Sequence, residues 1–185
     1  MLEAVGPGAS LLGHSSGAIY SLEAARQVPV ERLVLYEPPL IWAERGDPTG
    51  LVSRIRDLVG QGKREDAASL FFAEEGRLDE EGLEVLRSQP AWEPMVDLAA
   101  ICVREWEAIL AAGLTVDRYS TVKVPTLLLA GSENLDHPSM ATKQLEAALP
   151  NIRTVVLEGF RHDAHLLNPA LVASEVRAFL ASADT

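Results

Sequence analysis

The chain has 185 residues, of which 48% are hydrophobic, and carries a formal net charge of −11 at pH 7. This length and composition predict one globular domain with an apolar core and room for an insertion. The acidic balance, 16 Lys and Arg against 27 Asp and Glu, excludes a nucleic-acid-binding surface and a basic membrane-binding surface, because both need clustered cations.

The only cysteine, Cys102, excludes an internal disulfide. It lies in an apolar helical stretch, where we expect an inert, buried thiol. No apolar run approaches the roughly 20 residues that a membrane span needs. The start Met1-Leu2-Glu3 lacks the basic residues of a signal peptide. We therefore expect a cytoplasmic protein.

The first recognisable pattern is SLLGHSSGAIYSLEAA, residues 10–25, where an apolar strand gives way to a helix predicted over residues 16–27. Between the two, Gly13 to Gly17 fit G-x-S-x-G, the strained strand-to-helix turn called the nucleophile elbow. The glycines are expected to let the strand and the helix approach closely. Ser15 is expected to adopt a backbone conformation that most L-residues avoid.

Strands and helices also alternate after this motif, in the remainder of the N-terminal part and in the C-terminal part of the chain. Apolar runs bounded by Pro or Gly predict strands over residues 33–36, 126–130 and 154–157, and helical spacing predicts helices over 139–149 and 169–181. Asn168 is the expected cap of the last helix, with proline at its first position. This order predicts the α/β class with a parallel sheet.

Residues 39–117 show no strand pattern. Four segments there are predicted to be helical, over residues 49–60, 63–75, 79–88 and 91–112. We therefore expect a core made of residues 1–38 and 118–185, with a helical cap inserted at 39–117. The apolar residues of the cap either line a substrate pocket or pack its helices together, and packing is favoured for any single residue.

A serine hydroxyl becomes a nucleophile only when a nearby base removes its proton, so a histidine is expected on another loop at the same sheet edge. Of the four histidines, His162 is best placed, just beyond the last predicted strand. His14 is expected to support the turn, and His165 to pack nearby or cap the next helix. His137 lies on a loop with no geometric reason to reach the serine. His162 and His165 have no convincing third ligand nearby, so no metal is expected.

These motifs together resemble the α/β-hydrolase superfamily, in its capped, esterase-like branch. The elbow, the strand VPTLLLAG at residues 124–131 and the segment GFRHDAHLLNP at 159–169 carry the resemblance, which extends over essentially the whole chain. It implies an α/β-hydrolase sheet with a helical cap and the chain order Ser, acid, His. It also implies that His162 is the base and that the backbone N–H of Ser16 forms half of the oxyanion hole.

Two features depart from that family pattern. Only residues 1–8 precede the elbow strand, whereas the family has several further strands there. We therefore expect a partial fold: a fragment, a gene model begun at an internal methionine, or a truncated relative that needs a partner. Such a chain is expected to be weak or inactive alone and able to form a homodimer through an exposed sheet edge. The second departure is Asn134, which stands where the family usually has an aspartate.

The carboxylate of the triad must therefore come from elsewhere, because an amide in its place lowers turnover by roughly four orders of magnitude. Glu37 directly follows the strand at residues 33–36, which is expected to lie beside the elbow strand. Some haloalkane dehalogenases and lipases resemble this arrangement. The alternative is Asp136, two residues beyond Asn134, with Glu37 merely beginning the cap. We favour Glu37.

The sequence predicts a serine hydrolase that acts on a small ester-like or related carbonyl substrate through an acyl-enzyme. Ser15 attacks, His162 moves the proton, and no cofactor or metal is implied. A dehalogenase or an epoxide hydrolase is disfavoured, because those relatives use an aspartate at the elbow. The alternative function is a non-catalytic binding or interaction protein that retains the hydrolase fold.

Overall fold

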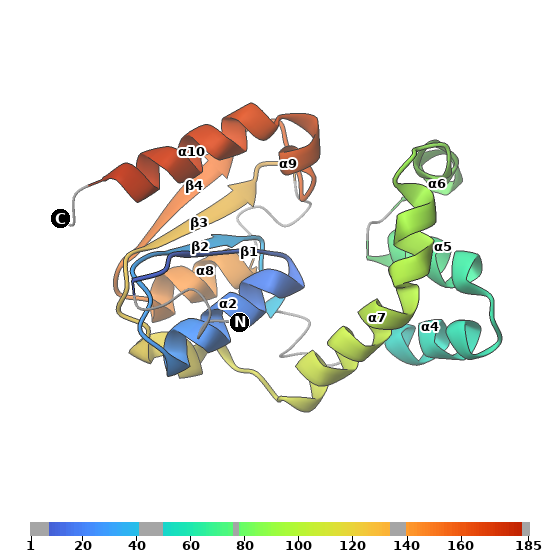
Figure 1. Cartoon of the computed structure of the whole chain (residues 1–185), viewed down its shortest axis with the longest axis horizontal. Helices are drawn as coiled ribbons and strands as arrows, with labels where there is room; N and C mark the ends of the chain where they lie inside the picture. The colour runs from blue at the N-terminus through green and yellow to red at the C-terminus, as the bar shows by residue number, and fades with distance from the viewer. Residues whose placement is uncertain (1–7, 41–49, 76–77, 134–139, 183–185) are drawn as a thin grey trace. The chain divides into compact units, whose positions relative to one another are not determined.

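The computed structural model describes residues 8–40, 50–75, 78–133 and 140–182. The chain divides into two compact units (Figure 1). One unit, the α/β unit, comprises residues 1–41 and 114–185, and the other, the helical unit, comprises residues 42–113.

A parallel sheet forms the centre of the α/β unit. Its described strands are β1 (Leu11–His14), β2 (Leu33–Tyr36), β3 (Thr126–Gly131) and β4 (Ile152–Leu157), paired in the order β1-β2-β3-β4. The register aligns His14 with Tyr36 and Tyr36 with Leu129. Because the strands are parallel, their carboxyl ends meet at one edge of the sheet. The predicted α/β class is confirmed, and β4 begins at Ile152 rather than at residue 154.

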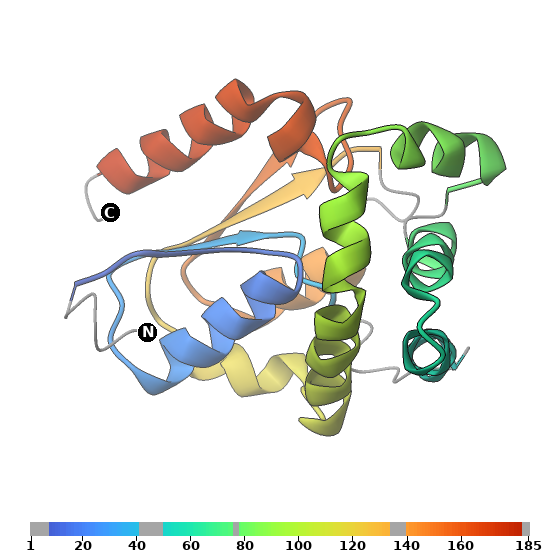
Figure 2. The ribbon, with the colours of Figure 1, turned by 45° about the vertical axis from the view of Figure 1, so that its right-hand side comes forward.

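Helices cover both faces of this sheet (Figures 1 and 2): α2 (Ser16–Gln27) and α8 (Met140–Ala148) on one face, and α10 (Pro169–Ala181) on the other. On the α10 side, Tyr36 and Leu129 belong to a buried cluster with Phe179. Leu33 and Leu35 are also fully buried. Burial on both faces explains why β2 is a continuous apolar run rather than an alternating one.

The helix α10 starts as the sequence predicts. The Asn168 side chain accepts a hydrogen bond of 3.1 Å from the Leu171 N–H, and Pro169 takes the first helical position. Two short elements escaped prediction, the 3₁₀ helix η1 (Val116–Thr121) and α9 (Ala164–Leu167). Each is too short to show a helical period in the sequence.

The helical unit contains α4 (Leu51–Gly60), α5 (Arg64–Glu74), α6 (Glu80–Arg87) and α7 (Trp92–Ala111). These helices lie within two residues of their predicted bounds. Leu51, Ile55 and Val103 belong to a buried cluster that the unit makes from its own residues. None of the described helices is long and apolar enough to cross a membrane.

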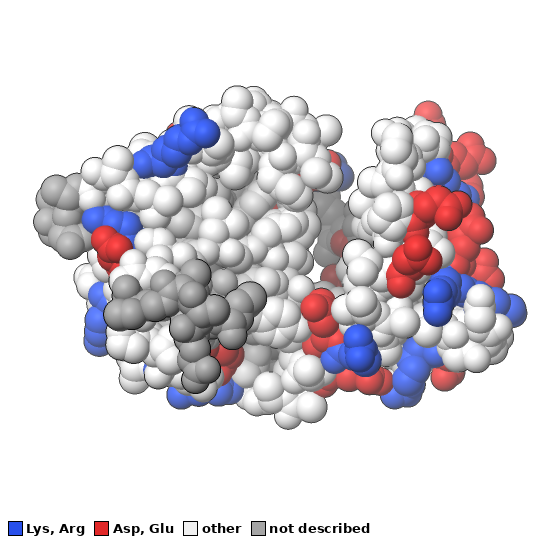
Figure 3. All heavy atoms as spheres, in the orientation of Figure 1, with Lys and Arg blue, Asp and Glu red and all other residues white. Residues whose placement is uncertain are grey.

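On the face drawn in Figure 3, the charged side chains of the helical unit include both signs close together. The ion pairs Arg54–Glu74 and Arg56–Glu107 are examples of this mixture. Basic residues on this unit are therefore partly neutralised locally by carboxylates. Such surface pairs contribute only about 0–1 kcal/mol each to stability.

The contact between β1 and α2 is too close for a side chain. A Cβ atom on Gly13 would lie 2.3 Å from the Gly17 carbonyl oxygen and 2.6 Å from the Ala18 Cα. A Cβ on Gly17 would meet nothing within 4 Å in the described part of the chain. Both glycines were expected to permit the approach, and the structure gives that steric role to Gly13.

Replacing Gly13 with alanine should therefore separate the strand from the helix. We expect Gly13→Ala to lower the free energy of unfolding by about 1–3 kcal/mol, as overpacking does. The matched control Gly17→Ala should leave it unchanged or raise it by up to about 1 kcal/mol, because alanine favours a helix. Urea unfolding of both variants measures the difference, and equal losses would contradict this role of Gly13.

Candidate active site

The residues predicted to act together follow neighbouring strands at the carboxyl edge of the sheet. Ser15 comes directly after β1 and Glu37 directly after β2. Since the register pairs His14 with Tyr36, Ser15 and Glu37 occupy adjacent positions one residue beyond the last aligned pair. His162 lies on the loop after β4, so segments far apart in the sequence meet at this edge.

Ser15 has the strained backbone that the elbow motif predicts, with φ 56° and ψ −127°. The other described non-glycine residue with positive φ is Glu37, at 46°. Each such residue costs of order 1–3 kcal/mol and persists only where its surroundings fix it. Here the Ser15 N–H donates to the Tyr36 carbonyl at 2.9 Å, and the Glu37 N–H donates to the Leu129 carbonyl at 3.2 Å.

Both carboxylate oxygens of Glu37 have hydrogen-bond partners. Oε2 lies 2.8 Å from Nδ1 of His162, and Oε1 accepts the Gly131 N–H at 2.7 Å. The Glu37 side chain is 13% exposed, whereas the His162 side chain is 48% exposed. With the carboxylate ionised, Nδ1 of His162 carries a proton and donates a hydrogen bond to Oε2. The imidazole Nε2 then has a lone pair with which to accept a proton.

His14 reaches the same loop from the elbow. Its Nε2 lies 3.1 Å from the carbonyl oxygen of His162, and because a carbonyl only accepts, Nε2 is the donor. Its ring centroid is 4.3 Å from those of His162 and His165. Burial, together with these two histidines, lowers the pKa of His14 to about 4. His14 is therefore neutral near pH 7, and its Nε2–H is committed to the loop rather than to Ser15.

The remaining predicted residues are placed as follows. His165 packs against the His14 ring, and burial lowers its pKa. The cap of α10 is Asn168, not His165. Ser16 begins α2, so its N–H has no acceptor within that helix and is available to another oxygen. The described residues contain no group of three or more side chains able to hold a metal ion.

Three residues of the loop between β3 and α8 that entered the sequence argument lie outside the described residues. They are Asn134, at the usual acid position, the alternative acid Asp136, and His137. The geometry of this edge is therefore built from Ser15, Glu37 and His162.

Sequence reasoning missed the backbone and hydroxyl groups that fix this edge. Gly131 donates its N–H to Glu37, and a Cβ there would lie 2.3 Å from the Phe160 carbonyl oxygen. The Tyr36 hydroxyl bonds to backbone groups of Arg161 and Ala164. The one available signal was a polar hydroxyl at the end of the otherwise aliphatic strand Leu33–Tyr36.

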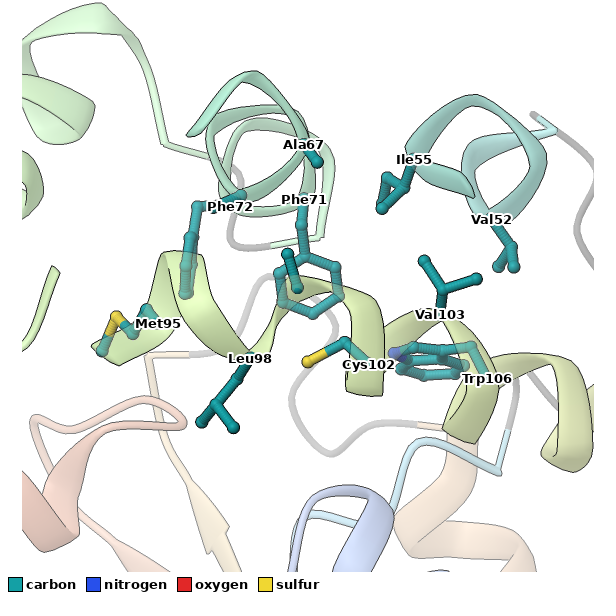
Figure 4. Close-up of a pocket in the computed structure, with 12 residues that line it drawn as sticks. Val52, Ile55, Ala67, Phe71, Phe72, Met95, Leu98, Cys102, Val103 and Trp106 are labelled. Atoms are coloured by element: carbon teal, nitrogen blue, oxygen red, sulfur yellow. The ribbon is translucent and has the colours of Figure 1, made fainter. Parts of the chain in front are cut away.

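The helical unit holds an apolar cavity of about 110 Å³ between α4, α5 and α7 (Figure 4). The side chains around it are almost entirely hydrocarbon, with Cys102 and Trp106 among them. Ile55 and Val103 also belong to the packed cluster of this unit. Some side chains of this unit thus both pack its helices together and line the cavity, so the two alternatives considered for the apolar residues are not exclusive. The lining residues are Val52, Ile55, Ala67, Ala68, Phe71, Phe72, Met95, Leu98, Ala99, Cys102, Val103 and Trp106.

Comparisons with known proteins agree with this architecture. A family model described as "Alpha/beta hydrolase family" matches residues 1–175. An alpha/beta hydrolase from Sphaerobacter thermophilus DSM 20745 is 26% identical, with a TM-score of 0.80 over 96% of this chain and 69% of that chain. No curated protein matched the sequence.

Two further solved structures share the fold at lower identity. A hydrolase from Pseudomonas aeruginosa PA01 is 21% identical, with a TM-score of 0.73 over 97% of this chain and 67% of that chain. The enol-lactonase from Burkholderia xenovorans LB400 is 21% identical, with a TM-score of 0.67 over 95% of this chain and 66% of that chain. The chain thus spans about two thirds of the length of these structures.

The half-buried histidine at the elbow predicts acid sensitivity of the fold. His14 has a pKa of about 4 in the folded protein against 6.5 for a free side chain, so between these pH values the unfolded chain binds more protons. Acidification from pH 6.5 to 4 therefore lowers the free energy of unfolding. In His14→Gln, which can still donate to the His162 carbonyl but does not titrate, part of this loss should disappear.

Urea unfolding at pH 7.5 and pH 5 measures the effect. We expect the wild type to lose more stability between these pH values than His14→Gln does. The exposed Val85→Gln variant, which changes no titratable group, should behave like the wild type. Identical pH dependence in the wild type and His14→Gln would contradict a depressed pKa at His14.

Proposed function

Because this chain belongs to the alpha/beta hydrolase family, we propose that it is a serine hydrolase with Ser15, His162 and Glu37 as its triad. Family membership supports a hydrolase function in general. The observation that carries the triad is the 2.8 Å hydrogen bond between Glu37 Oε2 and His162 Nδ1, at the sheet edge where the strained Ser15 also lies. The proposed substrate is a small ester or a related carbonyl compound.

The proposed reaction proceeds through an acyl-enzyme. The Ser15 Oγ attacks the carbonyl carbon while His162 Nε2 takes the hydroxyl proton, and the oxyanion accepts the Ser16 N–H. His162 then gives the proton to the leaving oxygen, and the carbon–oxygen bond breaks. A water molecule deprotonated by His162 then attacks the acyl carbon. The bond to Ser15 Oγ breaks, Oγ takes the proton back from His162, and the acid is released. Glu37 keeps the imidazole in the correct tautomer and stabilises its charged form.

Glu37 is preferred to Asp136 as the acid on three grounds. Its carboxylate is largely buried, with 13% of the side chain exposed, and contacts His162. The Gly131 N–H fixes its second oxygen, so the carboxylate is oriented without help from the histidine. Its positive φ of 46° is the kind of strain that is found at functional sites.

We also propose that residues 39–117 form a cap on a core made of residues 1–38 and 118–185. The division of the chain into units with boundaries at 41/42 and 113/114 supports this assignment. The apolar cavity of the helical unit supports a substrate with an aliphatic or aromatic group, because almost no polar lining atom would be desolvated by it. Leu98, 49% exposed, is the lining side chain most open to solvent.

The triad is tested by covalent labelling with a fluorophosphonate. The wild type should be phosphonylated at Ser15, and Ser15→Ala should not react. Glu37→Gln should slow labelling by about 10³–10⁴-fold, since an amide in place of the triad acid has an effect of that order on turnover. The matched control Asp136→Asn should react at close to the wild-type rate. Circular dichroism checks that each variant is folded.

Each outcome of this experiment is informative. If Asp136→Asn loses more reactivity than Glu37→Gln, the acid is Asp136. If the folded wild type is not labelled at all, the serine hydrolase proposal is wrong, and a binding protein with the hydrolase fold becomes the better reading.

The substrate class is tested with two fluorophosphonates that differ only in alkyl length. We expect the octyl reagent to label Ser15 faster than the ethyl reagent, because each buried CH₂ contributes about 0.8 kcal/mol. Equal labelling rates with the two reagents would contradict an apolar substrate.

A further inference from the structure

We propose that Tyr36 is a positioning residue, whose hydroxyl fixes the loop that carries His162. This proposal rests on the proposed role of His162 as the base. Tyr36 does not touch the reacting atoms in this scheme. It acts through the backbone on either side of the histidine.

The hydroxyl of Tyr36 has two partners that flank His162 in the chain. It donates to the carbonyl oxygen of Arg161 at 2.7 Å and accepts the N–H of Ala164 at 3.0 Å. The direction of each bond is fixed, because a carbonyl only accepts and an amide N–H only donates. The alternative partner of this N–H, the Arg161 carbonyl, lies at 3.4 Å and makes a weaker contact. One oxygen atom thus ties down the residue before His162 and the second residue after it.

The position of that oxygen is set by the core. Tyr36 is 2% exposed and packs in the buried cluster with Val34, Leu129 and Phe179. Burial raises its pKa to about 12, so the hydroxyl keeps its proton under assay conditions. By contrast, His162 is half-exposed and α9 is only one turn long, so burial alone holds the loop weakly.

Tyr36 is the last residue of β2 and Glu37 follows it, and both bind the loop that carries His162. Glu37 binds the imidazole of His162, and Tyr36 binds the loop backbone, so β2 fixes both the orientation of the ring and the place of its Cα. Without the hydroxyl, the loop would keep the Glu37–His162 bond and the His14 contact to the His162 carbonyl at 3.1 Å. It would also keep the bond from the Glu133 N–H to the Phe160 carbonyl at 3.0 Å. Of these three contacts, only the first two involve His162 itself. A small displacement of the base costs rate, because proton transfer needs hydrogen-bond geometry.

The test compares Tyr36→Phe with the matched control Tyr119→Phe. Tyr119 is also buried in the α/β unit, but the groups around its hydroxyl are Glu23, Arg118 and Arg26 rather than the histidine loop. Two readouts are used: the rate of fluorophosphonate labelling at Ser15, and the proton NMR signal of His162 Nδ1–H in its bond to Glu37. Thermal unfolding of both variants reports any general loss of stability.

We expect Tyr36→Phe to slow labelling by about tenfold, which corresponds to about 1.4 kcal/mol, and to broaden the Nδ1–H signal or speed its exchange with water. Tyr119→Phe should leave both readouts at wild-type values even if it lowers the melting temperature as much. Wild-type values in Tyr36→Phe for both readouts would overturn the proposal, and so would equal effects of the two variants.

The hydrolase proposal and the proposal for Tyr36 can be tested independently of each other. If the wild type is not labelled, the hydrolase proposal is wrong, while the Nδ1–H signal still decides whether Tyr36 holds the histidine. If Tyr36→Phe does not fold, amide exchange in the wild type decides instead. Protection of the Ala164 N–H would support its bond to the hydroxyl, and exchange at the rate of a free amide would overturn it.

Discussion

The carboxylate of Glu37 joins three parts of the chain that are distant in sequence. It directly follows β2, accepts the Gly131 N–H at the end of β3, and binds His162 on the loop after β4. Because it is mostly shielded from water, these bonds are stronger than they would be on the surface. The geometry of the whole sheet edge depends on this one carboxylate. Its partner at residue 131 must be a glycine, because the Phe160 carbonyl leaves no room there for a Cβ.

The same edge carries a conformational cost that the surrounding structure must offset. Ser15 and Glu37 both have positive φ, a backbone conformation that raises the free energy of the folded state at each residue. Their backbone N–H groups extend the hydrogen bonding of the sheet by one step, to the Tyr36 and Leu129 carbonyls. The strain is therefore held by a buried parallel sheet rather than by flexible loops. Stability of the core and precision of the edge are linked through these two bonds.

The sequence predicted what depends on local pattern. Apolar runs located the strands, helical spacing located α2 and α10, and the G-x-S-x-G motif predicted the strained conformation of Ser15. Contacts across the fold left little trace in the sequence. The hydroxyl of Tyr36 and the imidazole of His14 bind backbone atoms more than 120 residues away in the chain, and backbone acceptors have no sequence signature. Glu37 was expected beside His162 from strand order together with the family resemblance, whereas the roles of Gly131 and Tyr36 required the path of the loop after β4.

The helical unit builds its buried cluster from its own side chains, whereas every residue of the proposed triad comes from the α/β unit. Substitutions that reshape the cavity can therefore accumulate without disturbing the hydrogen bonds of Glu37. On the proposed scheme the chain is modular, with the reacting groups in one segment of sequence and the residues that would set selectivity in another. On that scheme, a library randomised only within residues 50–75 and 92–111 would vary the ligand without changing the reacting groups.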